Sequence, residues 1–174
     1  MGMLVWLESS SLAVWVHESP SVWAQPTVLT LHTMGMAVLV GASWVLDLRL
    51  LGISRNVPLS AFRWVFPAVT VGLIVNLVTG VLLFIQRATS LGTAIPFLIK
   101  MGLVIASVAT LLPLRSYVLR SGAEPSPSTV ARGVPSSVEG REVSGSARLL
   151  ALASILAWSG AIAAGRLLAY LVPA

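Results

Sequence analysis

A long apolar stretch at residues 26–50, interrupted by a single histidine, constrains the fold more than any other feature. At about 1.5 Å per residue it forms a helix of roughly 37 Å, which is enough to cross a hydrocarbon layer of about 30 Å with some tilt. We therefore expect a first transmembrane helix here.

Three ionisable residues lie on this stretch: His32, about two turns from its start, and Asp47 and Arg49, near its end. A separation of fifteen residues, at about 100° each, brings Asp47 back to within about 60° of His32, so both can face the same protein interior. Hydrocarbon offers an ionisable group no partner. An ionisable residue inside a transmembrane helix is therefore a candidate functional residue.

Three further apolar stretches predict spans at about residues 67–86, 95–117 and 147–171. Pro113 is expected to end or kink the third span. Residues 121–145 are rich in Ser, Pro and Gly, which cannot build a core, and predict a flexible loop. The fold class expected is all-α, with residues 1–174 forming one membrane domain, a bundle of four transmembrane helices.

The first 25 residues are apolar only in short runs, none long enough to span. With Trp6, Trp15 and Trp23 they predict one or two short interfacial helices on the membrane surface, where indole rings are favoured. Ser9 or Ser10 is placed to cap the second of these. Residues 87–94, between the second and third spans, are expected to form a short loop.

Composition supports the membrane assignment. The chain is 56% hydrophobic and only 10% charged, with a mean hydropathy of +0.91, whereas soluble domains carry about 25% charged residues. The net charge of +5 is scattered around apolar segments, which argues against nucleic acid as a partner. The absence of cysteine excludes disulfides and thiolate metal sites. No catalytic motif is present, so we do not expect an enzyme.

The distribution of cations predicts the orientation. Eight arginines fall on the side of the first/second and third/fourth connections: Arg49, Arg55, Arg63, Arg115, Arg120, Arg132, Arg141 and Arg148. Only three cations fall on the other side: Arg87, Lys100 and Arg166. The excess places the long loop in the cytoplasm and both termini outside.

With that orientation, His32, Lys100 and Arg166 lie at similar depth near the outer ends of three different spans. Unpaired cations at such a depth are costly, so the predicted site needs a negative partner. In one interpretation, Glu8 and Glu18 fold onto Lys100 and Arg166. In the other, the cations hold the acidic groups of a bound molecule, such as haem propionates, a quinone-site ligand or a lipid headgroup.

Two metal hypotheses follow from the same helix. A b-type haem would use His32 as axial ligand, and a second ligand would have to be His17, Met101 or a residue of another chain. Copper would use His32 and Met36, which are four residues apart and share a helix face. Methionine is more often core filler.

Small and hydroxyl residues form stripes on two spans. The second span carries Gly72, Asn76, Thr79 and Gly80, and Asn76 must find a hydrogen-bond partner inside the bundle. The fourth span carries Ala153, Ala157, Gly160, Ala161 and Ala164. Both stripes predict close helix packing.

Three stretches, LHTMGMAVLVGASWVLDLRLLG, PFLIKMGL and AWSGAIAAGRLLAYL, resemble a family of small bacterial four-helix inner-membrane proteins without assigned function. More distantly, the layout is similar to the copper-resistance D type of membrane protein. In the first family an arginine would stand at His17, and this departure argues against His17 as a required ligand. The resemblance implies a four-span bundle in a bacterial inner membrane and draws attention to His32, Lys100 and Arg166.

The function expected is therefore an accessory or structural subunit of a larger membrane electron-transfer or energy-converting complex. Its partners would be the lipid bilayer and other membrane subunits. Two alternatives stay open: an electron carrier with haem b on His32 and its propionates on Lys100 and Arg166, and copper binding or passage at His32 and Met36.

Overall fold

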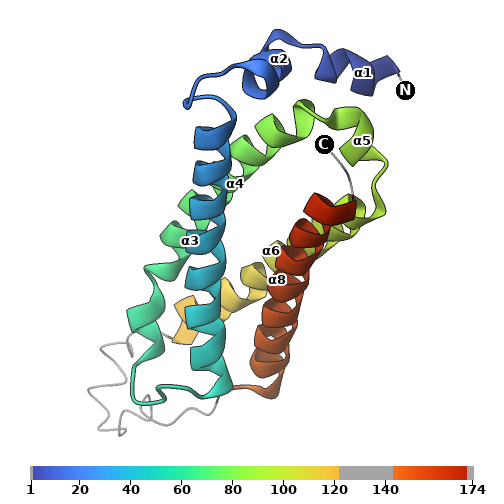
Figure 1. The fold of residues 1–174 in the computed structure, drawn as a ribbon. Helices are drawn as coiled ribbons and strands as arrows, with labels where there is room; N and C mark the ends of the chain where they lie inside the picture. The colour runs from blue at the N-terminus through green and yellow to red at the C-terminus, as the bar shows by residue number, and fades with distance from the viewer. Residues whose placement is uncertain (1, 122–142, 172–174) are drawn as a thin grey trace, which may run out of the picture.

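The computed structural model describes residues 2–121 and 143–171, and every regular element in these ranges is a helix. Four helices are long and apolar enough to cross a membrane: α3 (Gln25–Leu51), α4 (Val65–Ile85), α6 (Ile95–Ser121) and α8 (Gly145–Leu171). The expected all-α class with four such helices is thereby confirmed (Figure 1). Most of the predicted flexible loop, residues 122–142, lies outside the described ranges.

Local chemistry explains where α3 and α4 begin and end. α3 carries Pro26 in its first turn, and it ends at Gly52, whose φ of 109° lies in the left-handed region that closes helices. α4 begins two residues before Pro67, so this proline also stands in a first turn, where its missing N–H is not needed.

Pro113 does not end α6. The helix continues past it to Ser121, so of the two expected outcomes, an end or a kink, the end does not occur. Pro113 is exposed, whereas Leu111 and Leu114 on either side of it are buried in the core. Their packing holds the turn in helical conformation although proline removes one backbone hydrogen bond.

Two short helices precede the bundle, α1 (Gly2–Glu8) and α2 (Ser11–Glu18). They lie across the end of the bundle where α3 begins and α4 ends (Figure 1). Ser10 caps α2 by accepting a hydrogen bond from the backbone N–H of Ala13 at 3.3 Å, as one of the two serines was expected to do.

The segment expected to be a loop between the second and third spans contains a helix, α5 (Ala88–Gly92). The reason is a distant residue. The Glu8 carboxylate of α1 accepts hydrogen bonds from both the backbone N–H, at 2.9 Å, and the hydroxyl of Thr89 in the first turn of α5. An anion there satisfies a free N–H and complements the helix dipole.

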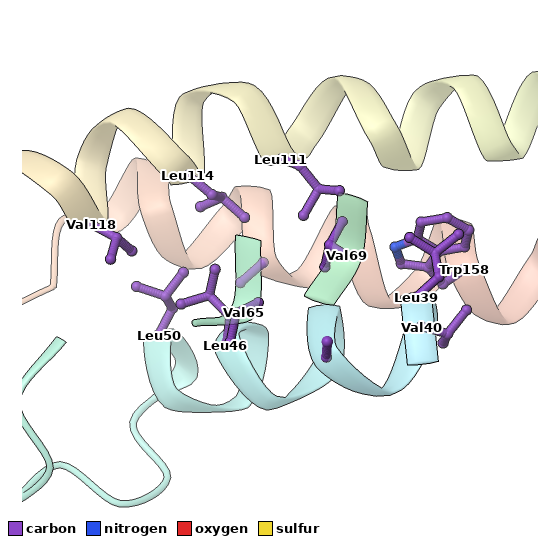
Figure 2. Packing of buried hydrophobic residues seen from close by; sticks show 12 residues of the cluster. Leu39, Val40, Leu46, Leu50, Val65, Val69, Leu111, Leu114, Val118 and Trp158 are labelled. Atoms are coloured by element: carbon purple, nitrogen blue, oxygen red, sulfur yellow. The ribbon is translucent and has the colours of Figure 1, made fainter. Parts of the chain in front are cut away.

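The four long helices associate as two pairs. α4 packs on α3, α6 packs on α8, and the pairs join mainly through α3 and α8. The short 3-10 helix η1 (Leu59–Phe62), just before α4, touches α6. Figure 2 shows the core where the pairs meet, with Leu46 and Leu50 of α3 facing Leu114 and Val118 of α6.

Candidate functional site

The site is built on a close helix contact, between α3 and α4. A Cβ added to Gly72 would lie 2.9 Å from the carbonyl oxygen of Gly35 and 2.8 Å from the backbone nitrogen of Leu39. Only a glycine fits there, because the obstructing atoms are backbone. The predicted small-residue stripe of the second span therefore brings the two backbones into contact.

His32 is fixed inside this contact. Its side chain is 9% exposed, and its Nδ1 lies 3.0 Å from the Thr79 hydroxyl oxygen. Thr79 donates its own proton to the Val75 carbonyl at 2.6 Å, so the Nδ1–H of His32 is the donor to Thr79. The neutral ring consequently carries its lone pair on Nε2.

A second hydrogen bond holds the backbone of His32. The Asn76 side-chain amide donates to the carbonyl oxygen of His32 at 2.9 Å, which supplies the partner that the sequence required. Gly80 leaves room for the ring, since a Cβ there would lie 3.3 Å from the His32 Cε1. His32 is thus held by hydrogen bonds from Asn76 and to Thr79, and Gly80 leaves space for its ring.

Lys100 belongs to α6, in the other helix pair. Its aliphatic chain lies over Gly165 of α8, where a Cβ would stand 3.5 Å from the lysine Nζ. Arg166, the next residue of α8, is exposed. The structure therefore buries His32, half-buries Lys100 and leaves the third predicted residue, Arg166, at the surface.

The expected pairing of Glu8 and Glu18 with Lys100 and Arg166 is not found. Glu8 is engaged with Thr89, and its pKa is held below the usual 4.5 chiefly by the hydrogen bonds from that residue. Glu18 is exposed at the end of α2. Within the described residues, Lys100 has no carboxylate hydrogen-bonded to it.

The residues predicted as metal ligands lie in different environments. Met36, one turn after His32, packs against the hydrophobic core. Met101 is 37% exposed on α6, and His17 is exposed on α2. Among the described residues, no group of three or more His, Cys, Asp or Glu side chains is arranged to hold a metal ion.

Asp47 was expected to face the interior of the bundle but was not among the predicted site residues. It is completely buried between α3 and α8, and neither carboxylate oxygen has a hydrogen-bond partner. The Ser154 hydroxyl lies nearby without normal hydrogen-bond geometry, and the indole N–H of Trp158, one turn further along α8, is also unpartnered. The helical spacing from His32 predicted the inward direction of Asp47, but not its unpartnered state.

No protein-family model, curated protein or solved structure matches this chain. The resemblances drawn from the sequence therefore stay predictions.

Proposed function

We propose that this protein is a non-catalytic polytopic membrane protein that serves as an accessory subunit of a larger complex. Four helices of sufficient length and apolarity support the membrane assignment. The exposed indoles of Trp6 and Trp23, 69% and 72% exposed, suit an interfacial location for the N-terminal helices. The charge distribution favours a bacterial inner membrane orientation with both termini outside.

The observation that carries the proposal is an exposed stripe of small residues on α6. Gly102, Ala106 and Ala109 are all exposed and are spaced four and three residues apart, which puts them on one helix face. A Cβ added to Gly102 would meet no atom within 4 Å. Only 11% of the apolar window of α6 is buried, compared with 33% for α3 and α8.

Small-residue stripes in membrane helices allow another helix to approach closely. The other stripes of this chain already have partners inside the bundle: Gly72 meets the α3 backbone, and Gly160 of α8 meets Leu103 of α6. The α6 stripe is free to receive a helix from a different chain. The partner proposed is a subunit of a membrane electron-transfer or energy-converting complex.

The test is a substitution on the stripe. Gly102→Leu should fill the docking face while leaving the bundle intact, because open space surrounds the residue. The full chain would be purified in a mild detergent, and its mass and co-purifying membrane proteins compared by native gel and mass spectrometry. We expect the wild type to migrate with a defined partner and Gly102→Leu to lose it.

Gly41→Leu provides the matched control, since Gly41 of α3 is exposed and equally open. It should retain the partner. A wild-type chain that stays a solitary monomer when cross-linked in its own membrane would contradict the proposal, as would a Gly102→Leu variant that keeps the partner.

One observation favours a second candidate, a b-type haem electron carrier. Metal-ligating histidines typically donate one ring N–H to a protein acceptor and bind through the other nitrogen. His32 donates Nδ1–H to Thr79, so Nε2 would be the nitrogen that holds iron, and Lys100 would be the residue that pairs with a propionate. When bound, haem would supply one-electron chemistry.

An ultraviolet-visible spectrum of the purified protein tests this candidate. A reducible Soret band, lost in His32→Ala and kept in His17→Ala, would support it. A colourless sample would reject it. Metal analysis of the same sample tests the copper alternative at His32 and Met36.

A further inference from the structure

A carboxyl group is enclosed in the contact between α3 and α8. Asp47 has an exposed fraction of 0%, and both of its carboxylate oxygens are buried without a hydrogen-bond partner. Leu46 and Leu50, which flank it along α3, are equally buried and belong to the hydrophobic core (Figure 2). The carboxyl group therefore lies beside the apolar core and out of contact with water.

The charged groups of α3 and α8 do not bond to this carboxyl group. Arg49, two residues after Asp47, donates to two backbone carbonyls of the loop that follows α3, at 2.8 and 2.9 Å. His32, fifteen residues earlier on α3, is bonded on the α4 side. On α8, Arg148 is half-buried but makes no hydrogen bond to Asp47, and Arg166 is exposed.

The other two long helices add no counter-ion. α4 has no ionisable side chain. α6 has Lys100, which is half-buried, Arg115 and Arg120, which are exposed, and Tyr117, whose hydroxyl accepts a hydrogen bond from the backbone N–H of Ser144 at 3.3 Å. Within the described residues, an ionised Asp47 would thus be a buried charge without a partner. Such a charge is so costly that the group takes up a proton instead.

We propose that Asp47 is a proton-binding site: in the folded protein it is a neutral carboxylic acid that donates its O–H to the hydroxyl oxygen of Ser154. A proton needs no space, so it can occupy a group that no water or metal ion reaches. Ser154 is fully buried on α8 close to the carboxyl group and has no hydrogen-bond partner. A neutral acid supplies the donor that a carboxylate lacks. The proposal does not depend on the accessory-subunit role.

Proton binding at Asp47 links the α3–α8 contact to pH. An aspartate in the unfolded chain is ionised above about pH 4, so folding above that pH takes up one proton. The unfolding equilibrium constant therefore rises about tenfold per pH unit from there until the buried acid itself ionises. Any separation of α8 from α3 that lets water reach the carboxyl group releases the same proton.

Asp47 is the only aspartate in the chain, which allows its protonation to be observed directly. The full chain is produced with carbon-13 in the aspartate side-chain carboxyl and studied in detergent micelles by nuclear magnetic resonance. At about pH 7 we expect the chemical shift of a neutral acid, in a signal that is absent from Asp47→Asn. The chemical shift of an ionised carboxylate at this pH, whether hydrated or paired with Arg148, would overturn the proposal.

A pair of serine variants tests the proposed acceptor. Ser154→Ala removes the hydroxyl oxygen and should move the Asp47 carboxyl signal while leaving the acid neutral. Ser107→Ala is the matched control, because Ser107 of α6 is also fully buried but donates to the Leu103 carbonyl at 2.8 Å. It should leave the signal in place. A signal that Ser154→Ala does not move would overturn the assignment of Ser154 as acceptor.

The pH dependence is measured by unfolding in titrated detergent from about pH 5 to about pH 8. Asp47→Asn resembles the neutral acid in shape but binds no proton, and both chains keep the two histidines. The ratio of the wild-type to the Asp47→Asn unfolding constant should therefore rise about tenfold per pH unit until the acid ionises. Glu18→Gln, which alters an exposed carboxylate, should follow the wild type. A ratio that does not change with pH would overturn the proposal.

Discussion

The two helix contacts of α3 treat buried polar groups in opposite ways. Against α4, the polar groups of His32, Asn76 and Thr79 bond to one another across the interface or along their own helix. Against α8, the polar atoms of Asp47, Ser154 and Trp158 are buried without hydrogen-bond partners. The polar groups of the first contact are hydrogen-bonded, whereas the second contact contains buried donors and acceptors that are not.

The difference lies in how closely the helices approach. Glycines at positions 35, 72 and 80 let α3 and α4 come near enough for short side chains to reach across. The α3–α8 contact is filled by larger side chains, with Leu39, Leu46 and Trp158 in the core (Figure 2). The Ser154 hydroxyl lies near the Asp47 carboxylate there, but the two do not reach normal hydrogen-bond geometry.

The largest expected effect comes from removing the close approach itself. Gly72→Ala should lower the free energy of unfolding by about 1–3 kcal/mol, because the new Cβ meets backbone atoms of α3 that cannot rotate away. Gly41→Ala, in open space on α3, should be neutral or add up to about 1 kcal/mol through helix propensity. Denaturation by titrated detergent measures both. Equal behaviour of the two variants would mean that the α3–α4 contact is not tight.

The next effect concerns the hydrogen bond to His32. Thr79→Val keeps the side-chain shape but leaves the buried Nδ1–H without an acceptor, and should cost about 1 kcal/mol. Thr70→Val on the same helix removes only an exposed bond to the Phe66 carbonyl and should cost almost nothing. The same denaturation measures the pair. If Thr70→Val lowered the free energy of unfolding as much as Thr79→Val, the interhelical hydrogen bond would not be the cause of the loss.

The α3–α8 contact should respond in the opposite direction. Asp47→Leu replaces a buried carboxyl that has no partner with a side chain of similar size, so stability should stay unchanged or rise by up to about 1 kcal/mol. Asp47→Asn keeps a polar group in place and should bring no gain. A large loss of stability in Asp47→Leu would show that the carboxyl has a partner in the membrane, and the contrast between the two contacts would disappear.

Sequence reasoning recovered what depends on local pattern. Apolar length predicted the four long helices, and the helical spacing of His32 and Asp47 predicted that both face inward. The stripe containing Gly72 and Asn76 correctly indicated close packing. Each of these follows from periodicity along one helix.

Features that depend on two distant segments were missed. Pro113 suggested a helix end or a kink, but α6 continues through it, with Leu111 and Leu114 packed in the core on either side. Arg166 was expected at the same depth as Lys100. Lys100 is half-buried and Arg166 is exposed, because depth alone does not fix the rotation of a helix. The residues around 88–92 have no helical pattern, and α5 depends on a carboxylate about eighty residues away in the sequence, Glu8 with Thr89.

The smallest expected effect concerns the hydrogen bonds between Glu8 of α1 and Thr89 of α5, at the exposed end of the bundle. Since hydrogen bonds from Thr89 lower the pKa of Glu8 below 4.5, the ionised form is favoured when the contact is made. The contact should be complete above the ordinary pKa and lost as the pH falls through the lowered value. The Thr89 amide signal, followed by nuclear magnetic resonance from about pH 6 to about pH 3, should shift in that range. Glu8→Gln should remove the transition, and Glu18→Gln should leave it. A transition that persists in Glu8→Gln would assign it to another group and make α5 independent of α1.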